Sequence, residues 1–471
     1  MNKMRRTSLD SKRIAVLATG LAASVAASMA ASAQQAQPPQ AREWSMDAGL
    51  EHSDNIRRTD DGSASDTIAQ AGLTINFANT RPRLDTQIGA DLKYWTYLDN
   101  TYKDEVVGGF NGGLTYSFKP ERFTWMVHDN FGQVAADPRS TVTAGNRRNV
   151  NFLTTGPDLT FPLGGTVNTL VLSGRYSRVN YDGSNDSDIS QNVNGGNGQN
   201  NVKYMGSLGL VHRLSEESSI SLNGSSTRTQ YDADPAFVLN AQDYDVRTVS
   251  LGFDAKGIRT TLGTSVGYTE LRFDNEHHSG LLARFSLSRK IGTRSTLMAE
   301  VGTQYADTAD TFAQGQVFRG VDSNTSDATA SNDPFKSDYL NVSWLLIGVR
   351  STMTLGVYSR KETHEHEADL DRKVETLLFD ISRRLGPRTT LTGTGRYIRD
   401  RFDGTPDVVT NTRVDLDSWS VGAGIQWLLG RSLGAQLRFD RQTGSGTGAS
   451  RTYTENRAYA GLTFTGGSAV R

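Results

Sequence analysis

The fold is decided by a predicted hairpin, Ala69-Gln-Ala-Gly-Leu-Thr-Ile-Asn-Phe77, then a turn at Asn79-Thr-Arg-Pro82 and a second arm, Leu84-Asp-Thr-Gln-Ile-Gly-Ala-Asp-Leu-Lys-Tyr94. Odd-numbered residues of the first arm are apolar, and the even-numbered residues between them are polar or glycine. In the second arm the even-numbered residues are mostly apolar, and the odd-numbered residues are polar or glycine. A period of two is typical of a β-strand, because successive side chains point to opposite faces. Each arm therefore has one apolar face and one polar face.

The same alternation recurs along the chain and predicts about 20 strands, with a range of roughly 18–22 from boundary errors. Tight turns, such as Thr80-Arg-Pro82 and Gly386-Pro-Arg388, alternate with long polar links, such as residues 182–201 and 308–336. This ordering is typical of a membrane barrel whose two ends face different compartments. We predict an all-β fold: a closed antiparallel transmembrane β-barrel with short periplasmic turns and long extracellular loops.

Composition excludes several classes of protein. The 471 residues include 50 Lys and Arg against 51 Asp and Glu, so the chain lacks the basic excess of a nucleic-acid binder. There is no cysteine, which excludes disulfides, thiolate catalysis and Cys-ligated metals. Hydrophobic residues make up only 36%, which suits strands with one wet face.

The chain divides into three parts. A basic start with Lys3 and Arg5, an alanine-rich apolar stretch and Ala31-Ser-Ala33 predict a signal peptide at residues 1–33. Residues 34–41 form a polar lead-in, and residues 42–471 form the barrel. The expected location is the cell outer membrane, reached after secretion across the inner membrane.

Charged residues alternate with apolar ones in the predicted strands and are candidates for the lumen wall. These candidates are Asp85, Asp91, Lys93, Arg175, Lys203, Arg272, Arg396, Arg438 and Arg457. They could pair into a wet wall that holds the barrel open, or form a path for hydroxyl-rich or anionic polymers. The link at residues 308–336 could either fold into the lumen or remain outside.

Other polar clusters predict little chemistry. His364 and His366 have no clear third metal ligand, and His277-His278 is expected in a solvated link. The stretch from Asp182 to Asp188 lacks the spaced glutamate of a calcium loop. No G-x-S-x-G, H-E-x-x-H or phosphate-loop motif is present. We predict no enzyme activity, no catalytic residues, no cofactor and no metal.

The opening strand, Met46-Asp-Ala-Gly-Leu-Glu-His-Ser-Asp-Asn-Ile56, resembles the start of the type-2 β-barrel porin family. The matching positions are Glu51, Ser53, Asp54, Asn55 and Ile56, and His52 replaces the more usual aromatic residue. The resemblance implies an outer-membrane barrel associated with exopolysaccharide and capsule export clusters. It carries over no catalytic residue.

The leading hypothesis is therefore a porin-like conduit or accessory for exopolysaccharide export. Its expected partners are outer-membrane lipid, polysaccharide and periplasmic export components, without nucleic acid. Two alternatives are a closed structural or adhesive barrel that binds through its extracellular loops, and a general diffusion porin. A lipid-modifying enzyme is a third, which would need a Ser-His pair facing the membrane.

Overall fold

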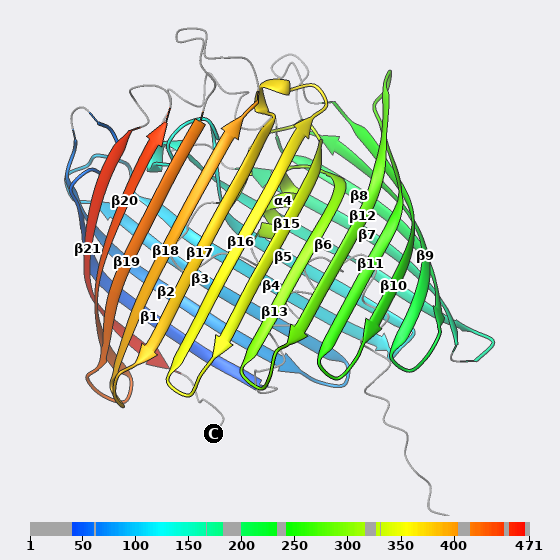
Figure 1. Ribbon diagram of the computed structural model, residues 1–471, viewed down its shortest axis with the longest axis horizontal. Helices are drawn as coiled ribbons and strands as arrows, with labels where there is room; N and C mark the ends of the chain where they lie inside the picture. The colour runs from blue at the N-terminus through cyan, green and yellow to red at the C-terminus, as the bar shows by residue number, and fades with distance from the viewer. Residues whose placement is uncertain are drawn as a thin grey trace, which may run out of the picture.

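The computed structural model describes residues 40–60, 63–165, 167–181, 199–232, 242–315, 326–329, 331–403, 415–446 and 452–466. Their strands form one sheet that curves round and closes on itself (Figure 1). The strands are β1 (Gln40–Ser53), β2 (Asp66–Thr80), β3 (Leu84–Tyr97), β4 (Glu105–Lys119), β5 (Phe123–Ala135), β6 (Arg147–Leu163), β7 (Asn168–Tyr181), β8 (Asn201–Arg213), β9 (Ser218–Tyr231), β10 (Tyr244–Lys256), β11 (Thr260–Arg272), β12 (His277–Lys290), β13 (Ser295–Ala306), β14 (Ser326–Thr329), β15 (Phe335–Ile347), β16 (Ser351–His364), β17 (Arg372–Arg384), β18 (Thr389–Phe402), β19 (Asp415–Leu428), β20 (Leu433–Gly446) and β21 (Tyr453–Gly466).

The wall of the barrel consists of 20 strands, because β13 pairs directly with β15 and the short β14 pairs in parallel with β5 instead. Strand β1 pairs antiparallel with β21, from Trp44 opposite Gly466 to Ser53 opposite Arg457. The sheet therefore has no free edge. The prediction of a closed antiparallel barrel of about 20 strands is confirmed.

The hairpin that predicted the fold has the expected register. Leu73 lies opposite Leu92 and Phe77 opposite Ile88, so the apolar faces of β2 and β3 coincide. Gln70 and Lys93, on the opposite face, line an internal cavity. The period of two thus places apolar side chains outside the barrel and polar ones inside.

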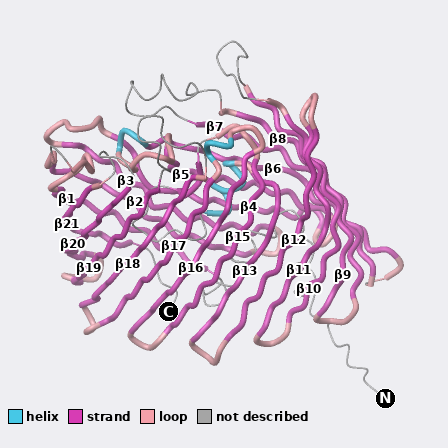
Figure 2. The backbone as a smooth tube through the Cα atoms, turned by 45° about the horizontal axis from the view of Figure 1, so that its top comes forward, coloured by secondary structure: helices cyan, strands magenta, loops and turns pink. Residues whose placement is uncertain are grey.

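Among the described residues, three short helices interrupt the all-β pattern: α4 (Thr308–Gly315) and the 3-10 turns η2 (Ala144–Asn146) and η4 (Ala368–Leu370). None of the described helices is long and apolar enough to cross a membrane. Helix α4 lies within the ring of strands (Figure 2). The Asp307 side chain accepts a 2.9 Å hydrogen bond from the Asp310 main-chain N–H, which caps the first turn of this helix.

In the part of the chain that the structure describes, two links enter the lumen. Phe312 of α4 is fully buried in a cluster with Val134, Val150 and Val179, which project inward from β5, β6 and β7. The described part of the 308–336 link therefore folds inward, one of the two possibilities left open by the sequence. The link at residues 136–146 also crosses toward the opposite wall, where Arg139 contacts Asp369 of η4 at 3.0 Å.

Closure of the sheet predicts a simple behaviour on gels. We expect the purified protein to migrate faster in SDS before boiling than after, because a ring without free edges leaves detergent no exposed strand at which to begin unfolding. Identical migration of boiled and unboiled samples, from membranes that contain the folded protein, would contradict a closed barrel.

Candidate functional site in the barrel lumen

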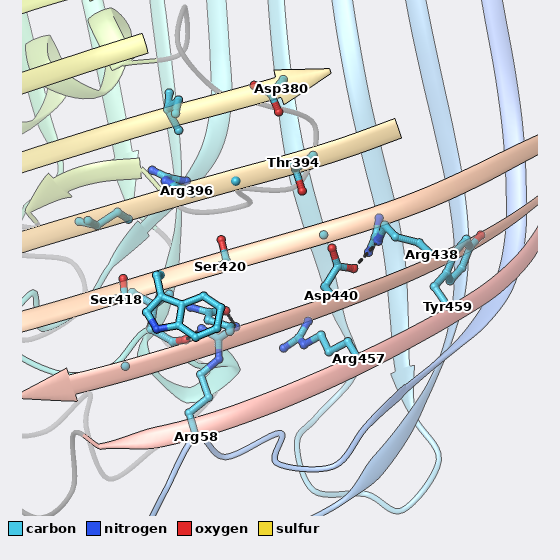
Figure 3. Close-up of a pocket in the computed structure, with 18 of the residues that line it drawn as sticks. Arg58, Asp380, Thr394, Arg396, Ser418, Ser420, Arg438, Asp440, Arg457 and Tyr459 are labelled. Atoms are coloured by element: carbon cyan, nitrogen blue, oxygen red, sulfur yellow. Dashed lines mark hydrogen bonds and ion pairs between the residues drawn. The ribbon is translucent and has the colours of Figure 1, made fainter. Parts of the chain in front are cut away.

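A cavity of about 810 Å³ follows one side of the lumen. Its wall comes from β16–β21 and β1–β3, and residues 138 and 140–144 of the β5–β6 link cover it from the other side. Figure 3 shows side chains of β17 to β21 directed into this space. The lining is rich in hydroxyl and amide groups, including Thr392, Ser418, Ser420, Gln436 and Gln442.

Glycine allows polar side chains to gather on this wall. Thr394, Gly422 and Asp440 lie opposite one another on β18, β19 and β20. A Cβ atom at Gly422 would lie 2.2 Å from Asp440 Oδ1 and 2.6 Å from Thr394 Oγ1. Only glycine at this position lets both neighbours lean over β19.

Buried glutamates hold the arginines that face the cavity. Glu51 of β1 accepts hydrogen bonds from Arg438 and Arg457, both at 3.0 Å. Glu455 of β21 pairs with Arg457 at 2.7 Å and with Arg58 at 2.9 Å. The two carboxylates are almost completely buried, whereas the three arginines line the cavity (Figure 3). This network, Arg438–Glu51–Arg457–Glu455–Arg58, is called the seam network below, because it spans the β1–β21 junction.

The other residues of the opening motif, Ser53 to Ile56, stabilise the same junction. Ser53 donates a 2.6 Å hydrogen bond to Glu455, and Asn55 Nδ2 donates to two main-chain carbonyls at 2.7 and 3.1 Å. Asp54, on the outer face, accepts two hydrogen bonds from Asn456 at 2.7 and 2.8 Å. Ile56 is buried among apolar side chains of β2, β3 and β4. The motif residues thus join the first strand to the last and to the lumen.

A second network lies on the neighbouring wall. Glu362 of β16 is fully buried and pairs with Arg360 and Arg372, each at 2.7 Å. Arg372 also pairs with Asp400 of β18 at 3.0 Å. As at the seam, the buried carboxylate lies behind an arginine that reaches the cavity.

The nine sequence-predicted lumen residues are divided among five environments. Five of them line the cavity: Asp91, Lys93, Arg396, Arg438 and Arg457. Asp85 shares the inward parity but lies beside a tight turn, where it accepts a 3.3 Å hydrogen bond from Thr80. Arg175 is buried in the wall of β7 and pairs with Asp158 at 2.6 Å.

Lys203 anchors the lumen helix rather than the cavity. Its Nζ lies 2.6 Å from Asp307 and 2.9 Å from Asp310, at the start of α4. The Tyr244 hydroxyl donates to Asp307 at 2.6 Å. A buried ammonium with two carboxylates therefore ties the inward link to β8 and β10.

The prediction that Arg272 lines the lumen is wrong. On β11 it has the parity of Val266 and Tyr268, whose side chains are 54% and 57% exposed on the outer surface, and it pairs with Glu270 at 2.8 Å. Arg272 is the last residue of its strand, so it lies on the outer face beyond the apolar belt. Charge alternation alone could not distinguish the two faces at a polar strand end.

Sequence reasoning missed several residues of the cavity. Asp380 and Asp440 have the inward parity of their strands, and this signal could have identified them. Arg58 lies in the link after β1, where no periodicity applies. Arg372 begins β17, and only the pairing of strands brings it to the cavity.

The histidines are arranged differently from the sequence expectation. His364 is buried beside Phe335, whereas His366 contacts Asp333 at 2.9 Å and Glu276 at 3.4 Å. His277 and His278 begin strand β12 instead of lying in the link before it, which corrects that expectation. In the described part of the chain, no three potential ligands are arranged to hold a metal ion. The stretch from Asp182 to Asp188 lies outside the described residues.

The pKa of His366 is raised above its ordinary value. Burial lowers the pKa of this imidazole, but hydrogen bonds and charge attraction from Asp333 and Glu276 outweigh that effect. Asp333 also accepts the main-chain N–H groups of His366 and Glu367, at 2.6 and 2.8 Å. Protonated His366 therefore strengthens the attachment of the inward link to the rim.

The outer surface shows where the barrel resides. Large apolar side chains cover it on successive strands, and Val249 and Leu251 of β10 are 60% and 66% exposed. A soluble protein rarely exposes so continuous an apolar surface, whereas a membrane barrel needs one. The chain is an outer-membrane β-barrel.

Comparisons with known proteins do not assign this chain to a family. No protein-family model and no curated protein matches the chain. Among solved structures, the siderophore receptor PirA from Pseudomonas aeruginosa is 10% identical, with a TM-score of 0.40 over 91% of this chain and 81% of that one. The FrpB iron transporter from Neisseria meningitidis is 8% identical, with a TM-score of 0.43 over 90% and 83%. Likenesses this weak do not bear on what this chain binds, and the resemblance to type-2 barrel porins stays a prediction.

Replacing one buried carboxylate should destabilise the seam. We expect Glu455→Gln to lower the free energy of unfolding by roughly 3–5 kcal/mol, because it leaves two guanidinium groups without their shared counter-charge. The measurement is urea unfolding in detergent or lipid. The matched control is Glu375→Gln, whose exposed partner is Lys373 at 2.6 Å and whose loss should cost less than about 1 kcal/mol. Equal effects of the two substitutions would contradict the role assigned to Glu455.

The contact between His366 and Asp333 should depend on pH. Because the folded-state pKa is raised, its stabilisation is fully present below the unfolded pKa of about 6.5 and is lost as pH rises through the folded value. Hydrogen exchange of the His366 and Glu367 amides, corrected for intrinsic rates, should therefore accelerate with rising pH. In His366→Gln this dependence should disappear, and its persistence would show that another group controls the contact.

Proposed function

We propose that this protein is a non-enzymatic, porin-like conduit that passes hydroxyl-rich saccharide during exopolysaccharide export. The observation that carries the proposal is the cavity along one side of the lumen, called the lane below, whose wall carries many hydroxyl, amide and charged side chains. Its chemistry suits sugar hydroxyls, and its length suits a chain rather than a single small molecule.

The lane extends along most of the barrel. Thr352 and Gln426, near the tight turns, line one end. Arg58 and Ser445, near the long links, line the other. The strands that line the lane are 13–15 residues long and separate these ends, so the lane runs roughly parallel to the wall over the membrane-spanning region.

The paired charges favour hydroxyl groups. An arginine held by a buried carboxylate keeps its geometry and still has N–H donors to offer, because a guanidinium has five of them. Serine, threonine and glutamine side chains supply both donors and acceptors on the same wall. Prearranged polar groups of both kinds can exchange hydrogen bonds with successive sugar hydroxyls at little cost in ordering.

The links that fold into the lumen argue against a general diffusion porin. Helix α4 occupies the side of β5–β7, and the link at residues 136–146 covers the lane. A 20-stranded barrel without such filling would enclose a wide aqueous channel. The contact between Arg139 and Asp369 supports the second candidate, a closed adhesive barrel, because it joins links from opposite walls.

Bilayer recordings test the proposal. We expect the purified protein to conduct ions and maltohexaose to reduce the current, because the sugar occupies the lane. Replacing Ser420 and Gln442 by leucine should weaken this block by about tenfold, since two sets of sugar contacts are lost at roughly 1 kcal/mol or less each. The control is leucine at Ser225 and Ser226 of β9, which are absent from the cavity wall.

Two outcomes would contradict the conduit. A correctly folded barrel without conductance would favour the closed adhesive barrel. Large conductance that no saccharide reduces would favour a general diffusion porin. Deleting the gene should also lower surface polysaccharide, and unchanged polysaccharide would remove the export role.

A further inference from the structure

The two ends of the barrel carry opposite charge. The nine tight turns, taken with two strand residues on each side, contain 15 basic and four acidic residues. The basic residues are Arg81, Arg83, Lys119, Arg122, Arg213, Lys256, Arg259, Arg289, Lys290, Arg294, Arg350, Arg383, Arg384, Arg388 and Arg431. The acidic ones are Asp85, Glu121, Glu216 and Glu217. Counted by sequence in the same way, with two strand residues on each side, the ten links at the other end contain 29 Asp and Glu against 14 Lys and Arg.

This polarity is hidden in the whole-chain composition, because the chain as a whole has a formal net charge of only -1. Its direction follows from the topology. Tight turns face the periplasm in outer-membrane barrels, and β1 begins and β21 ends at the same end as these turns (Figure 1). The periplasmic mouth is therefore basic and the extracellular mouth acidic.

Four exposed arginines lie at the periplasmic end of the lane. They are called the mouth arginines here and are Arg350, Arg384, Arg388 and Arg431. Arg350, Arg388 and Arg431 lie in tight turns and Arg384 is the last residue of β17. The strand residues that flank these turns and line the lane are Thr352, Ser382, Thr392 and Gln436. Arg384 also has the inward parity of Ser382 on β17.

The extracellular end differs, because the acidic excess lies in the links there and not in the lane wall. The wall at this end carries both signs, since Asp400 and Asp417 line it together with Arg58 and Arg372, and Arg372 is paired with Asp400. The nearby β16–β17 link at residues 365–371 has four carboxylates and no lysine or arginine. Such fields steer charged solutes and raise their local concentration by about 10- to 1,000-fold at a focused mouth. An anionic chain would be attracted at the basic end and repelled at the acidic end, where it must leave.

From this we infer that the conduit takes anionic polysaccharide from the periplasmic side, and that the mouth arginines capture it at the entrance of the lane. The inference rests on the proposed function and narrows its substrate class. Capture takes place at the entrance. Inside the lane, basic and acidic side chains are paired, so they exert no net attraction that would trap a polyanion. Binding would then be strong enough for entry and weak enough for passage.

Phospholipid is the other anionic partner within reach of these turns. Exposed aliphatic residues such as Val349, Leu385 and Leu429 lie beside the mouth arginines, as expected of turns near lipid headgroups. Lipid binding, however, would use basic turns all round the barrel equally. Capture by the lane requires only those beneath it, which provides a matched control.

The test is sided block of single channels in a planar bilayer. A hexamer of galacturonate is the anionic probe and maltohexaose the neutral one. Because the chain has no cysteine, Glu121→Cys in the exposed β4–β5 turn can be biotinylated, and streptavidin then reports the orientation of each channel. We expect galacturonate to block at about tenfold lower concentration from the tight-turn side than from the other side at low salt. Maltohexaose should show no such difference.

Two variants, each lacking four basic side chains, distinguish capture of polysaccharide at the lane from binding of phospholipid all round the barrel. Replacing the mouth arginines, R350Q/R384Q/R388Q/R431Q, should abolish the sidedness. The control K256Q/R259Q/R289Q/R294Q removes the same charge from turns beneath other strands and should preserve it. Gel migration before and after boiling confirms that both variants fold.

The possible failures are distinguishable. Normal conductance and maltohexaose block without galacturonate sidedness would overturn this inference alone. Equal loss of sidedness in both variants would also overturn it, in favour of general rim charge or bound phospholipid. Absence of conductance in the unmodified protein would overturn the proposed function itself.

Discussion

Every other feature of this protein depends on one constraint: each main-chain N–H and C=O group within the membrane must find a partner in the sheet. Lipid offers no hydrogen bonds, so an unpaired strand edge would be costly at this depth. The pairing of β1 with β21 removes that edge. Once the ring is closed, the alternation of side chains acquires a fixed meaning, with apolar residues in lipid and polar residues in the lumen.

Closure also explains the opening motif. Glu51 and Ser53 belong to the first strand, yet their contacts lie on the last two strands, almost the full chain length away. The buried carboxylates of the seam network neutralise arginines that would otherwise repel one another at the junction. The same guanidinium groups then face the lane, so the chemistry that joins the ends of the sheet also forms part of its polar wall.

The lumen is unequal on its two sides because two links fold inward. Helix α4 is held by apolar burial of Phe312 and by the ionic contacts of Lys203, while residues 136–146 cover the opposite wall. A 20-stranded ring is thereby reduced to a narrow lane. A large barrel with a narrow lane suits the proposed role of guiding a polysaccharide chain. The opposite charges at the two ends would favour passage from the periplasmic side to the extracellular side.

The sequence by itself determined the fold class, the approximate strand number and the alternation of tight and long links, because a period of two is a local property of the chain. It also identified Asp91, Lys93, Arg396, Arg438 and Arg457, whose inward parity follows from their own strands. It could not place Arg272, since polar residues at a strand end fit either face. Only the tertiary structure decided that Arg58 joins the seam network, that Lys203 anchors α4, and that the described part of the 308–336 link enters the lumen. These depend on which distant strands become neighbours, and that is settled by closure of the whole ring.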